Sequence, residues 1–394
     1  MPIDCLLAAD DLTGACDAAV HFAIHGLRPA TVLVARGTKA AGARVLAVST
    51  ESRDLPPEEI RRALAVAAAE FPVDSAACIF KKIDSTLRGN TGVEIAAALE
   101  WFHCDAAIVC PAFPRMHRVV EGGFLRVTGA PDFASVDVAG RLQLQAGHAC
   151  AHTRPEGIAA ILSAGARLVS VDANCDDDLD RIAAAILPMG LPVGLPTGRR
   201  ILWAGSAGLA AALARRLGVP GACPPACPPA PGPWPPAPAR APQPAPARTG
   251  AALFCIGSDH AATGAQQSSL LAERPSVLLH CHTATRQTIG DALARGQHVI
   301  LRIPRGLVSA EQVRKLIGGA PAAALVLSGG DTASLVCRAA GVHRIELCGE
   351  IVPGVPRGIL HGGEFDGIPV ATKSGGFGRS DALIQVADYF ACPN

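Results

Sequence analysis

CIFKKIDSTLRGN, residues 78–90, begins as an apolar strand and ends in a turn crowded with polar side chains. Open α/β folds place their ligands where such a buried strand leaves the sheet. The lysines and the arginine of this turn suit a carboxylate or phosphate, whereas its aspartate and hydroxyl groups suit sugar hydroxyls or a metal. The stretch therefore predicts an α/β fold with a site for a small polyhydroxylated acid. A solvated turn with a helix N-cap at Ser85 or Thr86 is the alternative.

The same pattern occurs at the start of the chain. Ile3–Ala9 predicts a buried strand, which breaks into Asp10, Asp11 and Thr13 before a helix that we expect over residues 16–25. Two adjacent carboxylates repel each other unless a cation or a hydroxyl-rich ligand lies between them, so they indicate a site. The alternative is that Asp11 or Thr13 caps the helix.

Polar exits from apolar strands recur through the first half of the chain. The strand expected over Val45–Ser49 leads to Arg53, which can form a bidentate contact with a carboxylate. Further strands are predicted over 31–35, 106–110, 167–172 and 201–204, a hairpin at FLRVTG (124–129), and helices over 57–71, 93–102, 176–187 and from 205. The pattern weakens between residues 130 and 154. This repetition predicts a parallel or mixed sheet flanked by helices. The small residues of GSAG (205–208) are most simply explained by close packing.

Length and composition restrict the class of protein. The 394 residues exceed what one hydrophobic core usually serves, so two domains are expected. Lys+Arg of 35 against Asp+Glu of 34 leaves a net charge of +1, which gives no reason to expect nucleic acid or an anionic membrane as partner. We see no basic and apolar leader and no apolar run of about 18 residues, so a cytoplasmic protein is expected.

Fourteen cysteines are scattered singly through apolar segments, and without an export signal they are expected to be reduced and buried. Cys223 and Cys227 form the one close pair. No second pair of Cys or His lies at a metal-ligand spacing from it, so structural zinc is disfavoured.

A change of composition marks a domain boundary. Residues 219–248 contain 13 of the 32 prolines, interleaved with alanine and without hydrophobic periodicity. Such a segment is extended and hydrated, so we expect a linker and not a ligand for an SH3-type domain. The sequence thus predicts an acid-binding domain over residues 1–218, the linker over 219–248 and a second domain over 249–394.

The second domain carries two glycine-rich turns, each after an apolar strand. Gly329 and Gly330 follow a strand expected over 323–327 and precede a helix over 333–340, while Gly375 and Gly376 follow a strand over 369–372, with Lys373 beside them. Backbone N–H groups in such turns close on phosphate, and a helix N-terminus adds its partial positive charge. Two such turns favour a nucleotide site. Neither matches GxxxxGK[ST] or GxGxxG. Other elements expected here are strands over 251–256 and 299–303 and a helix over 309–317.

Together these segments resemble the four-carbon acid sugar kinase family, whose members phosphorylate threonate, erythronate or 3-oxotetronate with ATP. The resemblance rests on nine motifs that span nearly the whole chain in the order of the family: AADDLTGACD (8–17), TESRDL (50–55), FKKIDSTLRGN (80–90), CPAFP (110–114), AGSAGLAAAL (204–213), GSDHAATGAQ (257–266), LSGGDTA (327–333), GEIVPGVPRG (349–358) and ATKSGGFG (371–378).

The resemblance implies a division of labour between the two domains, with the acid sugar on the first, ATP on the second and the active site in the cleft between them. The residues implied to contact the substrate are Asp10, Arg53, Lys82, Ile83, Asp84 and Ser85. Those implied to contact the nucleotide are Ser258, Gly329, Gly330, Asp331, Thr332, Gly375 and Gly376. Phosphoryl transfer also calls for Mg²⁺, whose ligands the sequence leaves unknown, and for one base, for which Asp11 and Asp84 are the candidates.

We therefore expect an ATP-dependent kinase that phosphorylates the terminal hydroxyl of a four-carbon sugar acid. The expected partners are the sugar acid and ATP, with a homodimer as a further expectation. After PAFP the chain reads PDFASVDVAGRLQLQAGHACAHTR (131–154) where the family has a DPxxPMxES-like stretch. This departure keeps two alternatives open: a kinase of another small hydroxy acid, and a catalytically weak relative that binds nucleotide or sugar acid.

Overall fold

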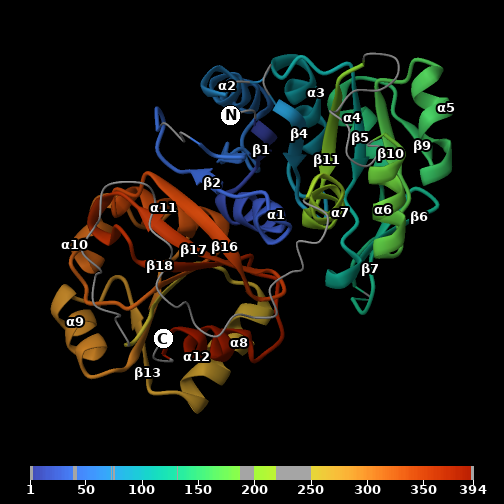
Figure 1. Cartoon of the computed structure of the whole chain (residues 1–394). Helices are drawn as coiled ribbons and strands as arrows, with labels where there is room; N and C mark the ends of the chain where they lie inside the picture. Colours follow the sequence, from blue (N-terminus) through green and yellow to red (C-terminus); the bar gives the residue numbers. More distant parts are fainter. Residues whose placement is uncertain are drawn as a thin grey trace. The chain divides into compact units, whose positions relative to one another are not determined.

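The computed structural model of the chain describes residues 3–38, 42–71, 73, 76–130, 132–186, 199–218 and 250–391 (Figure 1). The chain divides into two compact units, residues 1–222 and 223–394. The expected linker over 219–248, with Cys223 and Cys227, lies outside the described residues. Each unit has its own sheet and its own helices.

The sheet of the first unit is parallel throughout. Its spatial order is β2 (Ala30–Leu33), β3 (Val45–Ser49), β1 (Ile3–Ala9), β4 (Ala76–Lys82), β11 (Ile201–Gly205), β5 (Ala106–Cys110), β10 (Leu168–Val171) and β9 (Ala151–Thr153). Parallel strands buried on both faces are typically continuous apolar runs. Accordingly, every residue of β5 and β11 is buried.

Two rows of helices accompany this sheet. One row contains α1 (Leu12–Ile24), α7 (Ala207–Leu217) and α6 (Asp176–Ala184), and the other α2 (Pro57–Glu70), α3 (Thr91–Trp101) and α4 (Val138–Ala146) (Figure 1). Helix α5 (Ile158–Ser163) connects β9 to β10. A separate antiparallel sheet of β6 (Arg118–Glu121), β7 (Phe124–Val127) and β8 (Val136–Asp137) confirms the expected hairpin. Short 3-10 turns lie at Pro114–Met116 and Pro155–Gly157.

The sheet of the second unit is mixed. Five parallel strands come first, in the order β13 (Ser276–His280), β14 (His298–Arg302), β12 (Leu253–Ile256), β15 (Leu325–Ser328) and β18 (Pro369–Lys373). The antiparallel β17 (Val355–His361) and β16 (Arg344–Val352) follow as a hairpin. The helices are α8 (Ala261–Glu273), α9 (Arg286–Ala294), α10 (Ala310–Ile317), α11 (Gly330–Ala339) and α12 (Ala382–Ala391), with a 3-10 turn at Gly363–Phe365. Strands β12 and β15 and helix α12 supply most of its core.

These two sheets confirm the predicted fold class, but several predicted boundaries were wrong. Helix α1 begins at Leu12 and not at residue 16, because Asp11 caps it by accepting a hydrogen bond from the N–H of Gly14. Helix α11 begins at Gly330 and not at residue 333. No helix starts at Ser85 or Thr86, so the N-cap alternative there was wrong; α3 begins at Thr91.

Several elements had escaped the sequence pattern. They are α4 and β9 in the stretch where the pattern weakens, α5, and α8, β13, α9, β16, β17 and α12 in the second unit. Strand β13 is only partly buried and α8 presents few buried side chains, so neither carries a clear apolar period. All described cysteines are free thiols, and most are buried. Among the described helices, none combines the length and the apolar character needed to cross a bilayer.

Close packing at the start of α7 explains the small residues there, as expected. A Cβ added to Gly205 would lie 2.5 Å from the backbone oxygen of Cys110, and one added to Gly208 would lie 2.8 Å from that of Ala112. The hydroxyl of Ser206 donates to the same Ala112 oxygen. The backbone of β11 and α7 therefore touches the exit of β5 directly.

Gly205→Ala should destabilise the first unit by about 1 to 3 kcal/mol, because backbone atoms cannot move aside as a flexible side chain would. The matched control is Gly290→Ala on α9, where an added Cβ meets nothing within 4 Å. That substitution should be neutral or stabilising by up to about 1 kcal/mol through helix propensity. Urea unfolding of the two variants measures both effects, and equal midpoints would contradict the packing explanation.

Candidate functional site

The polar exits of three neighbouring strands of the first unit meet at one edge of its sheet. β1 pairs with β3 on one side and with β4 on the other, all parallel, so their carboxyl ends lie side by side. The chain after these strands carries Asp10 and Asp11, then Ser52 and Arg53, then Asp84. The structure thus gathers residues that lie more than seventy positions apart in the sequence.

Arg53 is the centre of this group. Its Nε lies 2.7 Å from Asp10 Oδ2, its Nη1 lies 2.5 Å from Asp11 Oδ2, and the same Nη1 lies 3.9 Å from Asp84 Oδ2. Burial opposes its charge, but Asp11 and Asp10 outweigh burial and raise the pKa of Arg53. The cation that two adjacent carboxylates require is therefore this arginine.

Asp10 keeps one oxygen available. Its side chain is buried, and its Oδ1 accepts no hydrogen bond from any described residue. Burial alone would raise the pKa of Asp10, but Arg53, with help from Lys81 and Lys82, holds it below the usual value. Asp10 is therefore ionised, and a buried carboxylate oxygen without a donor is an unusual feature that a ligand hydroxyl would satisfy.

Asp11 and Asp84 are already engaged. Asp11 Oδ1 accepts from Gly14 N and, at 3.3 Å, from the Thr13 hydroxyl, while Oδ2 faces Arg53. Asp84 Oδ1 accepts from Thr86 N at 3.0 Å and from the Thr86 hydroxyl.

The other oxygen of Asp84 lies 2.5 Å from Arg88 Nη2. Burial would raise the pKa of Asp84, but Arg88 and Arg53 hold it well below its usual range. Asp84 is therefore an ionised carboxylate with a donor on each of its oxygens.

Lys82 is the cation of the cluster with hydrogen-bonding capacity to spare. Its buried Nζ donates to Ile83 O at 3.0 Å, and an ammonium group has three N–H bonds. A Cβ added to Gly14 in the first turn of α1 would lie 3.3 Å from this Nζ, so Lys82 lies beside a helix N-terminus. Both features favour an anion there. The amide of Ile83 donates to Gly205 O at 3.0 Å, and Ser85 is buried nearby in sequence.

A buried layer supports the loop that carries Arg53. Lys81 is fully buried and its Nζ pairs with the Glu94 carboxylate from α3. The Ser52 hydroxyl donates to Glu94 Oε1 at 2.9 Å, one residue before Arg53. Burial raises the pKa of Glu94, and Lys81 opposes that shift. Sequence reasoning missed Glu94, whose one signal is an acid directly between two apolar residues, Val93 and Ile95.

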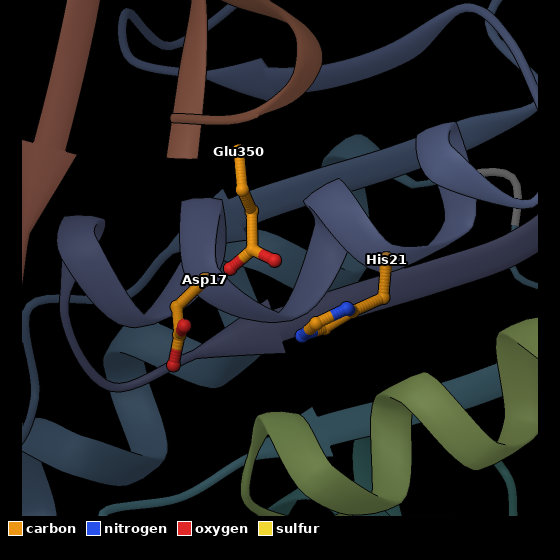
Figure 2. Close-up of side chains that lie close together, drawn as sticks. All are labelled: Asp17, His21 and Glu350. Atoms are coloured by element: carbon orange, nitrogen blue, oxygen red, sulfur yellow. The ribbon is translucent and has the colours of Figure 1, made fainter. Parts of the chain in front are cut away.

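Two further groups that sequence reasoning missed lie on α1. Asp17 and His21 are one helical turn apart, and Figure 2 shows both side chains leaving the same helix. Burial, reinforced by His25, lowers the pKa of His21 to about 3. His21 is therefore neutral at physiological pH.

In the second unit, the three loops after β12, β15 and β18 converge on Ser258. A Cβ added to Gly375 would overlap the Ser258 hydroxyl, and one added to Gly329 would lie 3.5 Å from Ser258 N. Gly329 has φ +98°, a conformation that glycine adopts without strain. Three of the seven residues expected to contact the nucleotide, Ser258, Gly329 and Gly375, are thus neighbours.

Helix α11 starts in the middle of this group. Its N-cap is Gly329, which has no side chain to cap the helix, so the first-turn N–H groups of Gly330 and Asp331 point out of the helix end. Thr332 lies instead against β12, since a Cβ added to Gly257 would overlap its hydroxyl. Gly376 lies beside His260, whose Nε2 would be 3.2 Å from an added Cβ.

Two exposed carboxylates at this edge could provide oxygen ligands for Mg²⁺. Asp331 forms an ion pair with Arg305, and Asp259 lies 2.6 Å from Arg302 Nη2. Lys373, which stands next to this glycine-rich turn in the sequence, is fully buried and donates to carbonyl oxygens of its own loop.

Comparison with known proteins assigns this chain. A family model described as a sugar-binding N-terminal domain matches residues 5–139 and 133–213, and one described as a nucleotide-binding C-terminal domain matches 265–383. A D-threonate kinase of Bordetella bronchiseptica is 34% identical over 97% of this chain and 96% of its own length. The chain belongs to the four-carbon acid sugar kinase family.

Other members of the kinase family are similarly covered. A D-erythronate kinase of Heliobacterium modesticaldum is 29% identical over 98% of this chain and 96% of its own length. A 3-oxo-tetronate kinase of Cupriavidus necator is 26% identical over 95% and 94%. Among solved structures, a Salmonella typhimurium LT2 protein shares the fold with a TM-score of 0.72 at 19% identity, covering 97% of this chain and 98% of that one.

Glu94→Ala should destabilise the first unit by about 3 to 5 kcal/mol, because it leaves the buried Lys81 ammonium without a counter-charge. The control is Glu100→Ala at the exposed end of the same helix, which should change stability by less than about 0.5 kcal/mol. Chemical denaturation followed by circular dichroism measures both. A Glu94→Ala loss as small as the control's would mean that Lys81 and Glu94 do not form a buried pair.

Proposed function

We propose that this chain transfers the γ-phosphoryl group of ATP, supplied as its Mg²⁺ complex, to the terminal hydroxyl of a four-carbon sugar acid. The observation that carries the proposal is the group of buried Asp10 and Lys82 with half-buried Arg53, in the unit that matches a sugar-binding model. Asp10 offers a hydrogen-bond acceptor for a sugar hydroxyl, and Lys82 offers a donor for a carboxylate. The named relatives act on D-threonate, D-erythronate or 3-oxo-tetronate.

In this proposal Lys82 holds the carboxylate of the sugar acid. It has donors to spare and lies beside the N-terminus of α1, whereas the charge of Arg53 is already balanced by Asp10 and Asp11. Arg53 then serves mainly to hold Asp10 in position and ionised. Ile83, Asp84 and Ser85 line the substrate site next to Lys82. Asp84 can contact the substrate only if its ion pair with Arg88 breaks.

Asp10 is our candidate for the group that receives the proton. Asp11 and Asp84, the candidates from sequence, have donors on both oxygens, while Asp10 Oδ1 has none among the described residues. The acceptor hydroxyl oxygen forms a bond to the γ-phosphorus, the bond from that phosphorus to the β–γ bridging oxygen breaks, and ADP leaves. The hydroxyl proton passes to Asp10 Oδ1. A base of low pKa suffices because phosphoryl transfer depends mainly on positioning and charge neutralisation.

The nucleotide phosphates are proposed to lie on the N-terminus of α11 and on the loop of Gly375 and Gly376. The uncapped first turn of α11 supplies N–H groups and the helix dipole, and glycine at 375 lets the backbone approach Ser258. Mg²⁺ bound to the phosphates neutralises charge in the transfer, and Asp331 or Asp259 could contact it.

Lys82→Met should weaken use of the sugar acid roughly 10- to 150-fold, since a charge-assisted hydrogen bond to the carboxylate is worth about 1.5 to 3 kcal/mol. A coupled ADP-release assay with D-threonate, D-erythronate, 3-oxotetronate and the corresponding reduced alcohols measures the effect. Lys315→Met, at an exposed position on α10, is the control and should retain native activity. If the native enzyme uses acids and alcohols equally well, the carboxylate is not what Lys82 recognises.

Gly375→Ala should weaken ATP binding by about tenfold or more, because the added Cβ overlaps the Ser258 hydroxyl and displaces one of the converging loops. Sugar-acid binding should keep its native affinity. Gly264→Ala on α8, where an added Cβ meets nothing within 4 Å, is the matched control. Calorimetric titration with each ligand tests the assignment, which fails if Gly375→Ala binds ATP as tightly as the control.

A further inference from the structure

The loop after β18 is folded around a buried cation. Lys373 Nζ donates to the carbonyl oxygens of Ser374, Gly375 and Phe377 at 3.0, 3.1 and 3.1 Å. An ammonium group has three N–H bonds, so these carbonyls use all of them. No described carboxylate forms an ion pair with Lys373. Lys373 could reach a phosphate only by releasing one of these carbonyls.

A second buried side chain continues the same arrangement. Gln266 Nε2, from α8, donates to the carbonyl oxygens of Phe377, Gly378 and Arg379 at 3.0, 2.9 and 2.9 Å. Thr263, one turn earlier on α8, donates its hydroxyl to Gly375 O at 2.7 Å. Along this loop the carbonyl groups therefore point inward, towards α8 and Lys373.

The geometry of the peptide bond fixes where the N–H groups point. In a planar trans peptide the N–H of one residue points away from the C=O of the residue before it. The inward carbonyls of Ser374 and Gly375 therefore turn the N–H groups of Gly375 and Gly376 outward. Neither N–H group donates to an acceptor among the described residues. Two consecutive outward N–H groups form a concave anion-binding surface.

Ser258 and His260 lie beside these two glycines. Gly375 lies against Ser258, and Gly376 against His260 Nε2. His260 Nδ1 accepts a hydrogen bond from Ala262 N at 3.1 Å, so the neutral ring carries its proton on Nε2. Ser258 and His260 therefore place polar groups next to Gly375 and Gly376, while the Lys373 ammonium is held by carbonyl oxygens of the loop.

We infer that Lys373 and Gln266 are positioning residues that hold the N–H groups of Gly375 and Gly376 towards the nucleotide phosphates, and that neither side chain touches the nucleotide. This inference rests on the proposed nucleotide site. It differs from the usual role of a lysine beside a glycine-rich loop, which is direct contact with phosphate. The two roles make different predictions for Gln266, which is neutral and buried.

The test is a double-substitution cycle in the full chain with Lys373→Met, Gln266→Met and the pair. Each single substitution should weaken ATP binding by about 10- to 100-fold, because each releases buried carbonyls and lets the loop turn. The pair should cost less than the product of the single effects, because both residues hold one loop. If Lys373 contacts phosphate directly, Gln266→Met leaves ATP affinity unchanged and the inference is overturned.

The pH dependence of ATP affinity provides a second test. It should change if the charge of Lys373 holds the loop, and it should not change if Lys373 only fills space in the core. Burial lowers the pKa of Lys373 to about 8. Its described hydrogen-bond partners are loop carbonyls and the Thr263 hydroxyl, none of which titrates in this range. Above this pKa the neutral amine keeps two N–H bonds and one carbonyl loses one of its two donors, so the loop is held less firmly and ATP affinity should fall.

Stability should change in the opposite direction. A lysine whose native pKa lies below its ordinary value of 10.5 releases its proton first in the folded state. The free energy of unfolding therefore gains a contribution between about pH 8 and 10.5. Lys373→Met should show neither the fall in ATP affinity nor the gain in the free energy of unfolding. If the ATP affinity of the native protein does not change across pH 8, the inference is contradicted.

Amide hydrogen exchange separates failure of this inference from failure of the proposed function. Without nucleotide, both single variants should exchange faster than native protein over residues 374–379. If the native protein binds ATP but the variants bind it equally well and exchange equally slowly, the loop inference is wrong and the kinase proposal stands. If the native protein binds no ATP, the kinase proposal fails, and the exchange rates alone decide whether the two side chains hold the loop. Should Lys373→Met not fold, Gln266→Met alone decides both points.

Discussion

A buried ammonium group must find acceptors inside the protein, because its removal from water costs several kcal/mol. Each unit of this kinase-family chain has such a group at the end of a central strand. Lys81 is the penultimate residue of β4 and pairs with a carboxylate, whereas Lys373 is the last residue of β18 and is surrounded by carbonyl oxygens. The acceptor for Lys81 is Glu94 on α3, which also binds Ser52 in the loop of Arg53. The acceptors for Lys373 are carbonyl oxygens of the loop after β18. Both loops belong to the candidate site. The desolvated charge thereby fixes the backbone of the site.

The two solutions differ in their chemical consequences. Lys81 and Glu94 neutralise each other, so the layer beneath Arg53 adds no net charge and acts through the hydrogen bond to Ser52. Lys373 has no counter-ion among the described residues, and its positive charge stays behind a loop whose N–H groups face outward. The first arrangement suits a site that already contains the three carboxylates around Arg53. The second adds to the positive potential that a phosphate group would meet at the end of α11.

The candidate site also shows why carboxylates of one cluster differ in chemistry. Asp10, Asp11 and Asp84 all lie near Arg53, but Asp11 is used as a helix cap and Asp84 as the partner of Arg88. Only the donors on each oxygen separate their roles, since all three carboxylates are buried. Proximity to a cation lowers the pKa of such a group, and the oxygen left without a donor determines which one can accept a substrate proton.

The sequence by itself determined the class of fold and predicted the edge of each sheet where the candidate site lies. Parallel strands buried on both faces are apolar throughout and end in polar turns. The sequence therefore showed β1, β3, β4, β15 and β18 as apolar segments followed by polar residues. It could not show which polar residues meet, because pairing of β1 with β3 and β4 is a long-range choice. The contacts of Arg53 with Asp10 and Asp11 follow from that pairing, whereas the pair of Lys81 with Glu94 depends on how α3 packs beside β4. The inward turn of Lys373 was likewise decided by the tertiary structure, because whether a lysine faces ligand or core depends on which carbonyl groups the fold leaves without donors.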